Sequence, residues 1–200
     1  MNDDYPPIWF RLPPGFYDVS PAQGTELVGA ARISGSAAAE GQIATLVQQL
    51  GLLGDHHVAH TAIGLHPDEE FGLCTSLFSL AIRPIAPGQR RREVGRAALG
   101  IAKSPLWTAS AGGFCEHPSA LPCCLVSGLM SVPEVDRHIF QARAALAHED
   151  GHHLIVLDLT SAATQHQDNY TDVLHGIVST ISFSDPTPPK TSSRILEVLL

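Results

Sequence analysis

The feature that most constrains this fold is the segment from residue 137 to residue 160, in which apolar residues alternate on both sides of Asp150-Gly151. Asp-Gly is a preferred two-residue loop for a β-hairpin with a type I′ turn, in which both central residues have positive φ. With that loop, apolar residues of the two strands face each other, and Arg143 faces Asp158. A shift by one residue would destroy both patterns, so the segment predicts a hairpin with one defined register.

The same register explains the stretch HEDGHH at the end of this hairpin. His148 and His153 face each other there, with Cβ atoms about 5 Å apart, and His152 lies on the opposite face. One interpretation is structural: the imidazoles lie at the rim of an apolar face because the turn places them there.

The other interpretation is a metal site. His148 and His153 are two candidate ligands, but zinc normally takes at least three protein ligands. His117 is our candidate for the third, with His60 and Glu116 as alternatives. This hypothesis describes a metal-binding protein or a metal-dependent hydrolase.

Length and charge exclude several classes of protein. Two hundred residues suit one domain. The chain has 12 basic and 20 acidic residues, and its net charge of -8 is a poor match for nucleic acid or for anionic lipid. No apolar run approaches the length of about 18 residues that a membrane span requires, so we expect none.

Hydrophobic periodicity predicts the remaining elements. Strands are expected at 8–12 (with a continuation at 16–19), 58–66, 71–83, 106–115, 122–131, 137–148 and 152–160, and helices at 36–52, 87–103 and 168–180. This order indicates the α+β class, with an antiparallel β-sheet flanked by helices in an α/β/α sandwich. We expect one domain over 1–183, followed over 184–200 by a Pro-rich linker and an apolar C-terminal peptide.

Cysteine usage favours a reducing compartment. The four cysteines are Cys74, Cys115, Cys123 and Cys124, with no C-x-x-C pair among them. The acidic start MNDDYPPIWF has neither the basic nor the apolar region of a secretory signal. We therefore expect four reduced thiols and a cytoplasmic location.

The sequence contains no established catalytic motif. It lacks G-x-S-x-G, the P-loop pattern and a G-x-G-x-x-G after a strand. Cys115 precedes His117 by two residues, but no oxyanion-hole pattern accompanies them. The acidic run 68–70 is typical of a solvated loop tip, and Gly112-Gly113 of a bend or bulge in a strand. We assign no catalytic residue and expect no cofactor.

Two segments resemble PsbP-like domains, which include actinobacterial lipoproteins and bacterial effector chaperones. One is the opening WFRLPPGF; the other is residues 137–183, with a hairpin, a helix and a final Ile-Ser-Phe. The resemblance implies an α/β/α fold and binding to protein partners, without catalytic residues.

We therefore expect a non-enzymatic protein-interaction module, acting as an adaptor or chaperone for a larger assembly or a secretion-linked partner. The candidate partner-binding residues are Ile195, Leu196, Val198, Leu199 and Leu200. This peptide can dock on its own domain, be presented to a partner's sheet or groove, or stem from an engineered protease site. An edge strand can also pair two copies across a two-fold axis.

Overall fold

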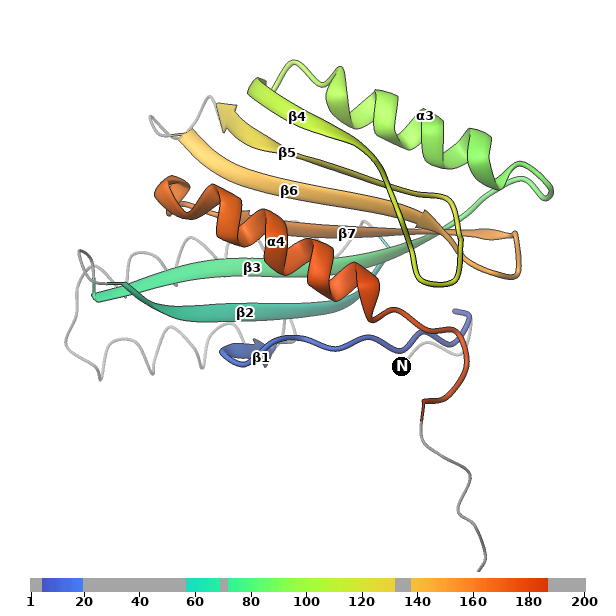
Figure 1. The fold of residues 1–200 in the computed structure, drawn as a ribbon, viewed down its shortest axis with the longest axis horizontal. Helices are drawn as coiled ribbons and strands as arrows, with labels where there is room; N and C mark the ends of the chain where they lie inside the picture. Colours follow the sequence, from blue (N-terminus) through green and yellow to red (C-terminus); the bar gives the residue numbers. More distant parts are fainter. Residues whose placement is uncertain (1–4, 20–56, 69–71, 132–137, 187–200) are drawn as a thin grey trace, which may run out of the picture.

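The computed structural model describes residues 5–19, 57–68, 72–131 and 138–186 (Figure 1). The helix expected at 36–52, the end of the linker and the apolar C-terminal peptide lie outside the described residues. Within them, seven strands form one antiparallel sheet in the order β1-β2-β3-β7-β6-β5-β4. The strands are β1 (Phe16–Asp18), β2 (Val58–Asp68), β3 (Gly72–Pro84), β4 (Trp107–Cys115), β5 (Cys123–Ser131), β6 (His138–Ala147) and β7 (His153–Ser161). The helices are α3 (Arg90–Ala102), a 3-10 turn η2 (Thr164–His166) and α4 (Gln167–Ser179).

The hairpin register predicted from the sequence is confirmed. Arg143 pairs with Asp158 across β6 and β7, and the two side chains form an ion pair. The predicted turn type is wrong, because Gly151 has a positive φ of 74° but Asp150 does not. Instead, the Asp150 carboxylate accepts hydrogen bonds from the backbone N–H groups of His152 and His153. These bonds stabilise a different loop with the same register.

Helices cover both faces of the sheet, as the predicted α/β/α sandwich requires. Successive side chains of β6 and β7 point to opposite faces of the sheet, and both faces carry apolar residues. α4 packs on one face through Tyr170 and Leu174, which join a large core that includes Phe78 and Phe140. α3 packs on the other face through Val94, in a smaller cluster. Figure 1 shows α4 crossing the strands and α3 beside β4 and β5.

The prediction of a first strand at 8–12 is wrong. In the structure Trp9 forms a single bridge to Ser182, with its N–H and carbonyl each 2.9 Å from the backbone partner. The ladder begins later, where β1 pairs with β2. Pro13 and Pro14 lie between these two segments, and a proline cannot donate a ladder hydrogen bond.

The prediction of four reduced thiols is also wrong. Cys115 and Cys123 face each other at the end of the β4–β5 ladder and form a disulfide. Cys74 and Cys124 are free and buried. No C-x-x-C spacing marks this pair, because the two cysteines become neighbours only through the pairing of β4 with β5.

Candidate functional sites

The first candidate site is the outer edge of β4. This strand is last in the sheet order, and its other side pairs with no strand of the described part of the chain. Its seven central residues are all exposed, and Phe114 exposes 73% of its surface. Gly112 and Gly113 have no side chains, so the backbone of β4 is uncovered at these two positions. The edge therefore offers unpaired backbone groups together with exposed apolar surface.

β4 lacks the usual features that protect an edge strand. Its sequence WTASAGGFC contains no charged residue and no proline, whereas natural sheets guard long edges with such residues or shorten them. The opposite edge, β1, is only three residues long. The sole irregularity of β4 is a shift near Trp107, not the bulge expected at Gly112-Gly113.

Two hollows flank this edge. The first has a volume of about 370 Å³ and lies between β4, near Ala109 and Ala111, and the first turns of α4, which contribute Asp168. The second has a volume of about 530 Å³ and lies near the disulfide end of the strand, where it is lined by Phe114, Arg91 and other residues. An added strand has side chains on alternate faces, so hollows of this kind can provide specificity.

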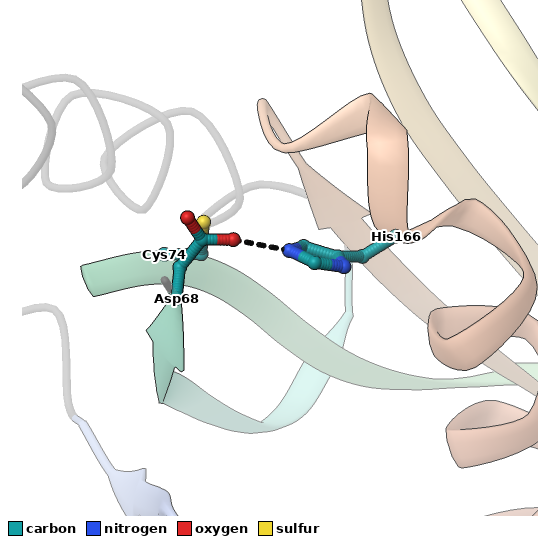
Figure 2. A group of neighbouring side chains, drawn as sticks. All are labelled: Asp68, Cys74 and His166. Atoms are coloured by element: carbon teal, nitrogen blue, oxygen red, sulfur yellow. Dashed lines mark hydrogen bonds and ion pairs between the residues drawn. The ribbon is translucent and has the colours of Figure 1, made fainter. Parts of the chain in front are cut away.

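The second candidate site is a polar cluster at the tip of the β2–β3 hairpin. His66 on β2 pairs with Cys74 on β3, and Asp68 lies two residues further on the same face of β2. His166 reaches this face from η2, and Figure 2 shows it pointing at the Asp68 carboxylate. The Nε2 atom of His166 lies 2.5 Å from Oδ2 of Asp68, although 98 residues separate them in the chain.

This cluster is largely buried. The side chain of Asp68 is 5% exposed and that of His166 is 33% exposed. Burial, followed by the hydrogen bond and charge of Asp68, raises the pKa of the Cys74 thiol to about 11. The thiol is therefore protonated at neutral pH and is not a nucleophile in this state. We expected Asp68 at a solvated loop tip, and this prediction is wrong because its side chain is buried.

Two further side chains complete the surroundings. The Nε2 atom of His66 lies 3.0 Å from the Ser76 hydroxyl, and burial, with the charge of His166 second, lowers the pKa of His66. The Tyr170 ring lies near both imidazoles. Among the described residues its buried hydroxyl has no hydrogen-bond partner. Burial raises the pKa of Tyr170, and the nearby Ser161 side chain lowers it in part.

The structure does not gather the three histidines predicted as metal ligands at one place, because only His148 and His153 are neighbours. His148 and His153 face each other, with ring centroids 6.2 Å apart, and both contact the Asp150 carboxylate. His148 also packs on Phe183. His117 is buried elsewhere, at the second hollow beside β4, where its Nδ1 accepts a hydrogen bond from a backbone N–H.

The alternative ligands are also separate. His60 lies beside Asp18 on the neighbouring strand, and Glu116 lines the second hollow. Among the described residues, one group of three possible ligand side chains lies within 4.8 Å, namely Asp68, Cys74 and His166.

Comparison with known proteins finds likeness in structure but not in sequence. No protein-family model and no curated protein sequence matches the chain. Among solved structures, the fold is similar to LpqN of Mycobacterium tuberculosis, which is described as involved in cell envelope biogenesis. The TM-score is 0.51 with 13% sequence identity, over 90% of this chain and 85% of LpqN. At this identity the likeness shows the fold alone. Neither helix in the described part of the chain is long and apolar enough to cross a membrane.

Proposed function

We propose that this chain is a non-enzymatic protein-interaction module that binds an extended segment of a partner protein along the outer edge of β4. The observation that carries the proposal is a nine-residue edge strand, exposed along its length, without charge or proline. Such an edge readily pairs with another chain unless something covers it. A partner strand would satisfy its free backbone groups.

The surroundings of the edge favour a partner segment with its own side-chain pattern. The two hollows beside β4 differ in character: one has Asp168 at the start of α4, and the other combines Phe114 with Arg91 and Glu116. A segment with apolar and charged side chains in alternation would fill both. The backbone would supply affinity and the hollows specificity.

The module serves as an adaptor or chaperone for a larger assembly or a secretion-linked partner, and its fold is of the PsbP-like group. The Cys115–Cys123 disulfide supports a compartment more oxidising than the cytoplasm, which differs from our expectation from the sequence. Cell envelope biogenesis, the process given for LpqN, is consistent with such a compartment.

The test is a selection of linear peptides from a displayed random library on the immobilised full chain. The edge variant is Ser110→Lys with Gly113→Lys, which places two charges on β4. A Cβ atom at Gly113 would meet no atom within 4 Å, so a side chain fits there. The matched control is Gly100→Lys with Gly176→Lys, at two helix positions that are equally open.

We expect selected peptides to bind the wild type and the control alike and to lose at least about tenfold in affinity for the edge variant. Hydrogen exchange should show slower exchange of the β4 amides in the complex. Peptides that bind all three proteins equally, or that protect another strand, would refute the proposal. A dimer with protected β4 amides would make the partner a second copy of this chain.

A further inference from the structure

We propose that Asp68, Cys74 and His166 form a binding site for zinc or a similar borderline-soft divalent cation. One carboxylate oxygen, the sulfur and one imidazole nitrogen lie within 4.8 Å of one another (Figure 2). They come from β2, β3 and η2, so the folded sheet and the start of α4 position all three. This site is independent of the β4 edge and of the hairpin histidines His148 and His153.

The kinds of ligand determine which ion fits. Zinc binds cysteine sulfur, histidine nitrogen and carboxylate oxygen, and a thiolate disfavours magnesium and calcium, which prefer oxygen. The carboxylate and the thiolate together carry two negative charges, which a divalent cation neutralises. This matters because Cys74 is only 4% exposed and Asp68 is nearly as buried, and an uncompensated charge is costly at such a position.

The geometry requires only a small rearrangement. With bonds of about 2.0–2.3 Å, the ligand atoms of a tetrahedral zinc site lie roughly 3.2–3.7 Å apart. The His166 nitrogen and the Asp68 oxygen are 2.5 Å apart as a hydrogen-bonded pair. The ion would replace this hydrogen bond, and the two side chains would separate by about 1 Å. His166 is one-third exposed, which leaves room for its ring to move.

The protons balance without any further reactant. The Cys74 thiol releases one proton to solvent when its sulfur binds the cation. His166 binds through Nε2 as a neutral imidazole, with its remaining proton on Nδ1. Asp68 gives up hydrogen bonds that it now accepts and binds the cation instead. No oxidation or reduction takes part.

A water molecule or a neighbouring side chain would complete the coordination at the fourth position. His66 lies on the same face, opposite Cys74 in the strand register. The amide of Gln165 lies 3.9 Å from the Cys74 sulfur and can donate to it. Such contacts around the ligands hold them in orientation.

The experiment uses the full chain, purified without a histidine tag and freed of metal by chelation. Cobalt(II) serves as the optical probe, because tetrahedral cobalt with a thiolate ligand has a charge-transfer absorption, and zinc is then titrated in competition. The chain has two free thiols, so Cys74→Ser is matched by Cys124→Ser. His166→Gln is matched by His175→Gln, an exposed position on α4.

We expect one cobalt per chain with a thiolate absorption band that zinc abolishes. Cys74→Ser should lose the band, and His166→Gln should weaken zinc binding by about 100-fold or more. Both controls should behave as the wild type. Circular dichroism of each metal-free variant identifies any that fail to fold; an Asp68→Asn variant then provides a third ligand test.

Several results would overturn the proposal. These are no stoichiometric metal on the wild type, a band that survives Cys74→Ser, or a band that Cys124→Ser removes. Zinc binding that depends on His148 and His153 instead would move the site to the hairpin end and would equally refute it.

Discussion

The Asp150 carboxylate lies 2.6 Å from the Nδ1 atom of His153 at the end of the β6–β7 hairpin. The same oxygen is 3.2 Å from Nδ1 of His148, and the other oxygen accepts two backbone N–H groups. One carboxylate thus makes four of the polar contacts in the HEDGHH stretch. It connects the two facing imidazoles and closes the loop between the strands.

This arrangement predicts a dependence of stability on pH. Burial raises the pKa of Asp150, but the N–H of His152, the hydrogen bond of His153 and the charges of His148 and His153 together lower it to about 2, from 3.8. The folded state therefore binds this proton less readily than the unfolded state. The resulting stability is present above about pH 4 and is lost as the pH falls toward 2.

We expect Asp150→Asn to lower the free energy of unfolding by about 1 kcal/mol near neutral pH, since the site is partly screened by solvent. The difference from the wild type should shrink below about pH 4. Urea denaturation at several pH values measures it, with Glu149→Gln as a control in the same loop. A difference that stays constant down to pH 2 would contradict the assignment.

Gly112 and Gly113 should respond differently to substitution. A Cβ atom at Gly112 would lie 2.4 Å from the Leu125 carbonyl oxygen and 2.7 Å from Cα of Val126, both in the backbone of β5. A Cβ atom at Gly113 would meet nothing within 4 Å. We expect Gly112→Ala to destabilise the fold by about 1–3 kcal/mol and Gly113→Ala to be neutral or slightly stabilising. Thermal unfolding of the pair checks this, and equal effects would refute the close approach of β4 and β5.

Arg143 and Asp158 should be energetically coupled. Their side chains form two hydrogen bonds across β6 and β7, one of them 3.0 Å long, and are 34% and 20% exposed. In a double-mutant cycle with Arg143→Gln and Asp158→Asn, we expect a coupling energy of about 1 kcal/mol. High salt should reduce it only in part. A coupling energy of zero would show that the pair contributes to register without adding stability.

The Cys115–Cys123 disulfide closes a short segment with a sequence separation of 8. The loop-entropy relation gives about 2.5 kcal/mol of stabilisation for such a loop. Reductant should therefore lower the urea midpoint of the wild type and leave that of a Cys115→Ser, Cys123→Ser double variant unchanged. Cys124→Ser should retain the response to reductant. A wild-type midpoint that reductant does not move would argue against the bond.

The parts of the fold that depend on local periodicity follow from the amino-acid sequence alone. The β6–β7 register followed from residues 137 to 160, because alternation allows only one pairing that buries one face and places Arg143 opposite Asp158. The described strands from β2 onward and both long helices lie within a few residues of their expected bounds. Local patterns were sufficient because an apolar stripe or face is a property of neighbouring residues.

The contacts between distant segments could not be predicted from local patterns, because they arise when whole elements pack together. Nothing near Asp68 in the sequence indicates that His166 will meet it, because the packing of α4 on the sheet brings η2 over the hairpin tip. The Cys115–Cys123 pair likewise depends on the β4–β5 register. Alternation predicts which face a residue occupies, but the docking of whole elements determines which residues share that face, and both candidate sites depend on that docking.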